Sequence, residues 1–183
     1  YIDIAKEKGY DVLLMDSPLD SHFVNQLEQK LENSTFARVD ADIIDKLINK
    51  EDTAPSKLSD EEKEKLKPLF EKQVNPEGKG GKFNVQFENL SENEMPAVIT
   101  QPEFMRRMND MQRLSGQAGM MGGFEFFNLV VNANHPKVGE LLNATDEDKE
   151  KKTKQLCDLA LLSQGLLKGK ELSEFLKRSV DLI

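Results

Sequence analysis

The chain has 183 residues, of which 32% are charged, and its formal net charge at pH 7 is −8. This length allows one large domain, or a compact domain with a fragment of another, and it suffices to bury a sizeable core. The acidic balance excludes nucleic acid as the main expected partner, because phosphate binding requires a concentrated basic face and none is visible. No apolar run approaches the length that spans a membrane, so a membrane partner is not expected either.

Cysteine and histidine are too scarce to indicate a catalytic or redox site. Cys157 is the only cysteine, so an intrachain disulfide is impossible and a reducing, cytoplasmic location is the simpler expectation. It lies among leucines, where a small buried thiol fits, and neither His22 nor His135 stands in a recognisable catalytic context. The chain opens at Tyr1 without an initiator methionine, so we expect it to be a piece of a longer polypeptide.

The first forty residues are expected to alternate between helix and strand. A helix over residues 2–8 ends at Gly9, and a second helix begins after a cap at Asp20 or Ser21. Short strands are expected at residues 11–16, where the strand is buried, and at 35–39. This order is the βαβ pattern of a parallel sheet. Because four elements cannot complete such a domain, we expect the end of a larger one.

A change in the character of the sequence near residue 45 marks the expected domain boundary. It divides the chain into residues 1–45, the end of a first domain, and residues 46–183, a second domain. A short apolar helix at 43–48 and a loop at 51–56 lie at this boundary.

The second domain is expected to begin with a helix. Ser59 followed by Glu62 has the spacing of a capping box, which begins a helix. Pro68 lies inside this helix, so a kink or a restart is expected at Lys67. Its apolar face consists of Leu66, Leu69, Phe70 and Val74.

Three strands are expected after this helix. Phe83, Val85 and Phe87 alternate with polar residues, which is the pattern of a strand with one wet face. A shorter strand follows at 97–99, and a third runs through 126–131. Three strands with surrounding helices predict a small α+β domain, from which the C-terminal helices project.

A methionine-rich stretch lies between the second and third strands. Thr100 with Glu103 has capping-box spacing, and Pro102 suits a first helical turn. Methionine is flexible and polarizable, so a methionine surface can repack against many apolar partners. The expected stripe, with the two methionines of the glycine-rich loop at 115–123, is Phe104, Met105, Met108, Met111, Leu114, Met120 and Met121. The competing interpretation is that this stripe is ordinary core.

Residues 150–183 are expected to form two amphipathic helices joined by a turn at 165–170. Their apolar residues recur at helical spacing and are Leu156, Leu159, Ala160, Leu162 and Leu166 in the first helix, and Leu172, Phe175, Leu176, Val180 and Ile183 in the second. Leu161, Leu167 and Leu182 lie off those stripes and remain apolar. A second copy of the hairpin would cover them, so we predict a homodimer with an intermolecular four-helix bundle. The alternative is that the hairpin docks on its own domain.

A different class of function is a small α/β enzyme or metal-binding domain. Its site would lie at the carboxyl end of the strand at 11–16, where Asp16 and Asp20 would act as acid, base or metal ligands. No third ligand or base is nearby in the sequence, so turn and helix-cap carboxylates are the simpler interpretation.

Four segments, in one collinear order, resemble a known family. They are YDVLLMDSPLDSHFVNQL, the MPAVIT strand leading into EFMRRMNDMQ, the segment FNLVVNANHPKVGELL, and the closing LCDLALLSQGLLKGKELSEFLKRSVDLI. Together they are similar to the end of the middle domain and the C-terminal domain of the ninety-kilodalton heat-shock protein chaperones, of the bacterial high-temperature protein G type.

The resemblance implies a homodimeric, ATP-dependent molecular chaperone that acts on unfolded or partly folded client proteins. The family's terminal helices form an intermolecular four-helix bundle, and its amphipathic client-contacting helix corresponds to residues 104–114. In its middle domain, the place of an exposed client-contacting aromatic is held here by His22 and Phe23, with Asn25 further along. ATP and Mg²⁺ bind in an N-terminal domain that this chain lacks, so no cofactor and no ATPase activity are expected of the chain itself.

Overall fold

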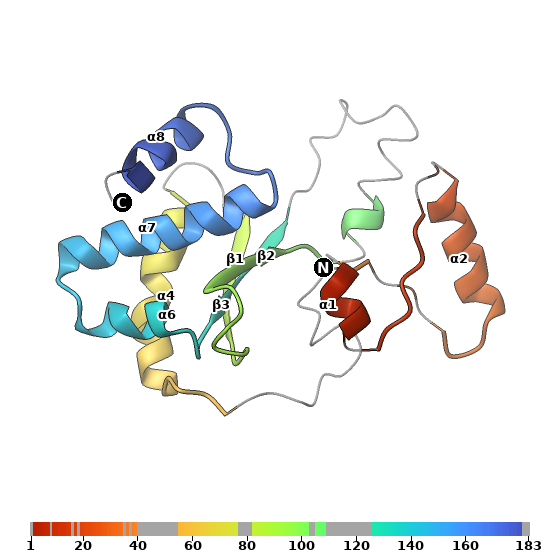
Figure 1. Cartoon of the computed structure of the whole chain (residues 1–183), viewed down its shortest axis with the longest axis horizontal. Coiled ribbons are helices and arrows are strands. Elements are labelled where there is room, and N and C mark those ends of the chain that lie inside the picture. Colours follow the sequence, from red (N-terminus) through yellow and green to blue (C-terminus); the bar gives the residue numbers. More distant parts are fainter. Residues whose placement is uncertain are drawn as a thin grey trace. The chain divides into compact units, whose positions relative to one another are not determined.

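The computed structural model describes residues 2–7, 9–15, 17, 19–34, 36, 38–39, 55–76, 82–102, 105–108 and 126–180. The chain divides into two compact units, residues 1–52 with 100–126 and residues 53–99 with 127–183. The C-terminal helices and the sheet, apart from Thr100 at the end of β2, belong to the second unit. Figure 1 shows this unit in yellow to blue, while the green segment after β2 belongs to the first unit. The expected boundary near residue 45 lies outside the described residues and stays a prediction.

The second unit contains a three-stranded sheet. Its strands are β1 (Phe83–Glu88), β2 (Ala97–Thr100) and β3 (Phe127–Asn132), in the order β1-β3-β2. β1 and β3 are parallel, with Phe83 opposite Phe127. A parallel pair needs a long crossover connection, and the chain makes β2 within it. The three expected strands and the α+β class are therefore confirmed.

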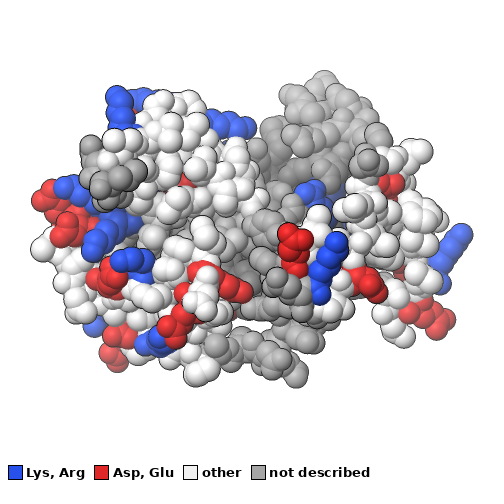
Figure 2. Space-filling view, viewed as in Figure 1, with Lys and Arg blue, Asp and Glu red and all other residues white. Residues whose placement is uncertain are grey.

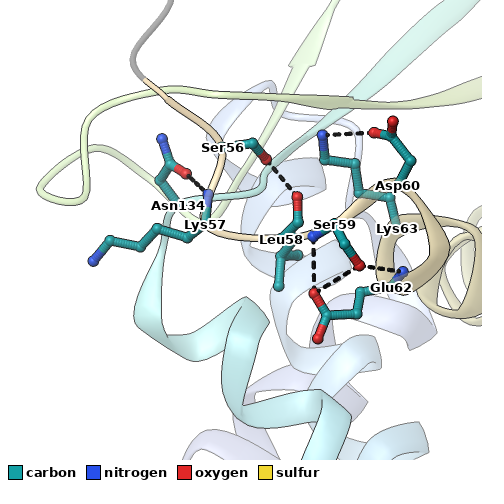
Figure 3. A network of polar contacts seen from close by, with 8 residues as sticks. All are labelled: Ser56, Lys57, Leu58, Ser59, Asp60, Glu62, Lys63 and Asn134. Carbon is teal, nitrogen blue, oxygen red and sulfur yellow. Dashed lines mark hydrogen bonds and ion pairs between the residues drawn. The ribbon is translucent and has the colours of Figure 1, made fainter.

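A complete capping box begins α4 (Asp60–Val74), as its sequence spacing predicts. The Ser59 hydroxyl accepts a hydrogen bond from the Glu62 N–H at 3.3 Å, and the Glu62 carboxylate accepts one from the Ser59 N–H at 2.8 Å (Figure 3). The hydrogen bonds that the Glu62 carboxylate accepts from the Ser59 N–H and from the Ser59 hydroxyl lower the pKa of Glu62. The carboxylate is therefore charged at neutral pH, next to the positive end of the helix dipole.

The helix does not restart at Pro68, so that part of the expectation is wrong. α4 runs through Pro68 without interruption, and Pro68 is exposed. A proline removes one hydrogen bond to the carbonyl four residues earlier. On the exposed side of a helix, water can satisfy that carbonyl, while the buried residues Leu66, Phe70 and Val74 hold the opposite face in place.

The core of the second unit lies where α4 meets the sheet and α7 (Asp146–Ser163). Phe70 is fully buried, and its ring meets that of Phe87 edge to face at 6.0 Å. Figure 1 shows α7 crossing α4 beside the sheet. The buried cluster also includes Leu66, Val85, Ile99, Leu129, Val131, Val138, Leu141, Leu156, Cys157 and Ala160.

Buried asparagines at the end of β3 tie the segment before α4 to the sheet. The Asn134 side chain accepts a hydrogen bond from the Lys57 N–H at 2.7 Å (Figure 3). It also donates one to the Leu90 carbonyl at 3.0 Å. His135 then caps α6 (Pro136–Gly139), which leads into the 3-10 helix η1 (Glu140–Asn143). His135 is thus a helix cap, a role that the sequence did not predict, and burial is the main cause that lowers its pKa.

The first unit contains α1 (Ile2–Glu7) and α2 (Asp20–Lys30). Gly9 follows α1 with a φ of +78°, which confirms it as the stop. Neither expected strand is found among the described residues, which include 11–15 and Phe36, Arg38 and Val39. Leu14 is 83% exposed, so the prediction of a buried strand is wrong. A strand needs a hydrogen-bonded neighbour, and the described part of this unit provides none.

The start of α2 also differs from the expected cap. Leu19 is the N-cap, and Asp20 is already helical. The Asp20 carboxylate accepts a hydrogen bond from the Ser17 N–H at 2.7 Å, and the Ser17 hydroxyl accepts one from the Leu19 N–H at 3.2 Å. The Asp20 carboxylate therefore accepts a hydrogen bond from the turn before the helix, and it does not cap the first N–H groups of the helix itself.

We expect Ser59→Ala to lower the free energy of unfolding by about 1 kcal/mol, because it removes the N-cap acceptor of α4. Urea unfolding followed by circular dichroism measures this difference. Ser173→Ala is the matched control, since the Ser173 hydroxyl bonds only the carbonyl of Gly169 within a helix and alanine favours helix. Equal stability of Ser59→Ala and the unmodified chain would contradict the prediction.

Candidate functional site

The C-terminal hairpin consists of α7 and α8 (Gly169–Val180), as the apolar spacing predicts. Thr145 caps α7, with its hydroxyl accepting a hydrogen bond from the Asp148 N–H. Gly165 and Gly169 have φ values of +65° and +57°, so both positions of the turn favour glycine.

α7 packs against its own domain. Leu156, Cys157 and Ala160 belong to the core cluster, and Leu167 in the turn is only 3% exposed. The expectation that Leu167 needs a second copy to cover it is therefore wrong, and Leu161 is partly buried against the same core. The side of α7 that carries Leu156, Cys157 and Ala160 therefore packs on its own domain, while pairing with a second copy stays a prediction. Burial raises the pKa of the Cys157 thiol far above its ordinary value, which suits a packing role.

The contact between α7 and α8 includes several polar side chains. Asp158 of α7, which is 4% exposed, forms an ion pair with Arg178 of α8 and a second with Lys154 at 3.4 Å. The Gln155 side chain donates a hydrogen bond to the Ser179 hydroxyl at 2.9 Å. Phe175 is the apolar residue that α8 buries, at 5% exposure. It is covered by its own chain, although we expected it at a dimer interface.

Three apolar side chains on another side of α8 form what we name the α8 ridge: Leu172, Leu176 and Val180. They are spaced four residues apart and therefore follow one line along the helix. Leu172 is half-buried, but Leu176 is 54% exposed and Val180 is 69% exposed. On the face that Figure 2 shows, uncharged side chains cover much of the surface over α8, with basic side chains beside them. Leu162 of α7 is also exposed, Leu159 and Leu166 are half-buried, and Ile183 lies outside the described residues.

The structure describes only part of the methionine-rich stretch. Residues 105–108 are helical, and the Arg106 N–H donates to the Pro102 carbonyl at 3.1 Å, which agrees with Pro102 in the first turn. We name residues 105–108 the methionine segment; its Met105 and Met108 are half-buried. The other expected contact residues, and Glu103 of the expected capping box, lie outside the described residues: Phe104, Met111, Leu114, Met120 and Met121.

Arg107 connects the methionine segment to α2 within the first unit. Its guanidinium donates two hydrogen bonds to the Glu28 carboxylate, at 2.7 Å and 3.0 Å, and one to the Asn25 side chain at 3.1 Å. It also donates to the Phe36 carbonyl at 2.7 Å. In the sequence, Arg107 simply stands between two methionines of the stripe. No local pattern could reveal a pair 79 residues apart.

The expected contact residues on α2 point in different directions. Asn25 is half-buried and bonds Arg107, whereas Phe23 is 55% exposed. Two residues along a helix differ by about 200° around its axis, so Phe23 lies on nearly the opposite side from Asn25. His22 is exposed.

The described residues do not favour the enzyme or metal-binding alternative. The Asp20 carboxylate already accepts a hydrogen bond in the turn before α2, and Asp16 lies outside the described residues. Among the residues that are described, no three His, Cys, Asp or Glu side chains are placed to hold a metal ion. No helix in the described ranges is long and apolar enough to cross a membrane.

Comparison with known proteins gives one consistent family. The family model "Hsp90 protein" matches residues 1–182. The chain is 35% identical to a chaperone protein HtpG of Bacteroides fragilis, 34% to one of Porphyromonas gingivalis and 33% to one of Bacteroides thetaiotaomicron. Each alignment covers all of this chain and 36% of the relative, so the chain spans about a third of the length of these relatives.

The family match covers nearly the whole chain, so one region of sequence similarity includes the residues of both units. This agrees with the resemblance carried by the four collinear segments. The aligned span of 249 positions is 66 longer than this chain, so these relatives carry additional positions within it. The chain belongs to the Hsp90 family.

Proposed function

We propose that this chain is the dimerisation and client-contact part of an ATP-dependent molecular chaperone. The observation that carries the proposal is the α8 ridge, which is apolar, continuous along the helix and exposed in the single chain. Family membership supports the chaperone role, because the similar bacterial proteins are named as chaperones. A cytoplasmic location, as expected from the single cysteine, is part of the same proposal.

The α8 ridge needs an apolar partner, and a second copy of the hairpin is the simplest one. Burying a large aliphatic side chain contributes about 1.5–3 kcal/mol, and a two-fold axis uses each residue twice. For the three ridge residues of both chains, counting only the exposed part of each side chain, burial in a dimer contributes roughly 5–10 kcal/mol. Association itself costs about 4–15 kcal/mol. The ridge alone is therefore marginal, so neighbouring apolar residues such as Leu162 must contribute to a four-helix bundle.

Client contact is proposed for the methionine-rich stretch and for the exposed part of α2. Met105 and Met108 are half-buried, so each offers part of a flexible apolar side chain to the surface. Phe23 and Leu19 on α2 are 55% and 71% exposed. Such surfaces fit apolar segments of unfolded proteins, which have no fixed sequence.

Nucleotide chemistry is proposed for other parts of the chaperone. Among the described residues, no acidic or histidine cluster fits Mg²⁺, and we assign no step in ATP hydrolysis to any of them. In this proposal, ATP and Mg²⁺ bind a domain that lies in the remaining two thirds of the family's length. The residues of this chain contribute assembly and binding.

We expect sedimentation at micromolar concentration to show a dimer, and Leu176→Asp to raise its dissociation constant at least about 100-fold. The reason is that a carboxylate without a partner is costly in an apolar interface, and the two-fold axis places two of them there. Met95→Asp is the matched control, because Met95 is 49% exposed and lies outside the hairpin. A monomeric chain would refute the assembly proposal, and an unchanged dimer of Leu176→Asp would refute the role of the α8 ridge.

Heat-denatured citrate synthase serves as the client protein. We expect the triple substitution Met105→Ser, Met108→Ser and Met111→Ser to reduce the ability of the chaperone to suppress the aggregation of this client. Serine removes the apolar side chains that would contact the client, and thermal unfolding tests whether the fold remains intact. Met95→Ser serves as the control, since it removes an exposed methionine elsewhere. Full suppression by the triple variant would show that these methionines do not contact clients.

A further inference from the structure

Arg107 joins three separate segments of the first unit through one guanidinium. Its Nη1 donates to Asn25 and Glu28 of α2, and its Nη2 donates to Glu28 and to the Phe36 carbonyl beyond α2. Each terminal nitrogen therefore has two acceptors. We name this group of four residues the Arg107 tether: Asn25, Glu28, Phe36 and Arg107.

The acceptors of the tether are themselves held in place. Glu28 accepts a hydrogen bond from the Phe36 N–H at 2.6 Å, so its carboxylate bonds both Phe36 and Arg107. The Arg107 hydrogen bonds are the main cause that lowers the pKa of Glu28, against the opposing effect of burial. Because this pKa is lowered by folding, the stabilisation is present at neutral pH and is lost as the pH falls through the lowered pKa.

The geometry of the tether requires an arginine. Two parallel N–H groups of a planar guanidinium match the two oxygens of a carboxylate, while a lysine ammonium is a single point charge. The side chains of Arg107 and Glu28 are 27% and 20% exposed. At this depth water screens the pair less than it screens an ion pair on the open surface.

We propose that Arg107 is a positioning residue, which fixes the methionine segment on α2 so that both client-contact segments are presented together. The proposal gives Asn25 a new role: its side chain belongs to the tether, although we first expected it to contact clients. Phe23, on nearly the opposite side of α2, remains available for contact. The part that concerns clients rests on the proposed function, while the attachment of the segment to α2 does not.

The attachment is tested by hydrogen exchange of the 183-residue chain and of its Arg107→Lys, Glu28→Gln and doubly substituted variants. We expect the amides of residues 105–108 and of α2 to exchange about tenfold faster or more in each single variant, because charge-assisted hydrogen bonds are lost. The double variant should exchange no faster than the faster single variant, because both substitutions remove the same interaction. Glu32→Gln is the matched control, since Glu32 is exposed and lies just beyond the end of α2.

Two outcomes would overturn the attachment: full protection of residues 105–108 in Arg107→Lys, or additive effects of the two substitutions. Arg107→Lys keeps the positive charge and most of the side chain. It therefore tests the paired N–H groups of the guanidinium without removing the charge that the folded unit holds at this position. Thermal unfolding of Arg107→Lys checks that the unit remains folded. The control variant should exchange at the rate of the unmodified chain.

The consequence for clients is tested with the same variants in the citrate synthase assay. We expect Arg107→Lys to lose suppression to the same extent as the triple methionine variant. If the amides of residues 105–108 exchange faster in Arg107→Lys, but this variant suppresses aggregation fully, the tether does not position a client surface. If the triple methionine variant itself retains full suppression, the proposed client function fails, and the exchange experiment still decides whether the tether exists.

Discussion

The apolar face of α4 is the constraint on which the second unit depends. Phe70 at its centre is fully buried and meets the edge of Phe87 on β1, and the same helix packs against α7 and η1. Both ends of α4 are fixed by side chains. Ser59 and Glu62 form the capping box at the start, and the Asn75 amide at the end bonds the N–H and the carbonyl of Phe83. The sheet and α7 therefore share one rigid support, and the position of the hairpin on the sheet follows from it.

The exposed ridge on α8 is a consequence of how α7 is used. α7 directs Leu156, Cys157 and Ala160 toward the core, so these side chains cannot also cover the next helix. What α7 offers to α8 includes Asp158, which pairs with Arg178, and Gln155, which bonds Ser179. Together with buried Phe175, these contacts attach α8 and leave Leu176 and Val180 exposed, and the proposed two-fold pairing would cover them without a further protein.

Local signals in the sequence predicted much of the second unit. The capping box at Ser59 involves residues three apart, the alternation in Phe83–Glu88 has a period of two, and the stripes of the hairpin have helical spacing. Each of these patterns depends only on residues that are near one another in the sequence, so the folded structure agrees with it. The sequence also predicted the stop at Gly9, because it acts within two or three residues. The cap at His135 also acts locally, through the Lys137 N–H, but it was not predicted.

The failures of prediction have a common physical cause, which is that their outcome depends on distant partners. A buried strand at 11–16 needs another strand beside it, and the burial of Leu167, at 3% exposure, is not visible in its spacing along the helices. Arg107 had no visible partner, since Glu28 is 79 residues away. At Pro68 the local signal predicted a kink or a restart, and α4 does not restart there, while its opposite face is held by the buried residues Leu66, Phe70 and Val74.

Two ion pairs hold the surfaces that we propose to be functional, and they act by the same physical principle. Asp158 with Arg178 attaches α8, and Glu28 with Arg107 attaches the methionine segment. Replacing such a partly buried pair with apolar residues is often neutral or stabilising, so net stability is a weak reason for its presence. The Glu28–Arg107 pair is bidentate and therefore directional, so it fixes orientation without covering apolar surface. The Asp158–Arg178 pair acts beside Phe175, which α8 buries, and this attachment leaves Leu176 and Val180 of the α8 ridge exposed for the proposed second subunit.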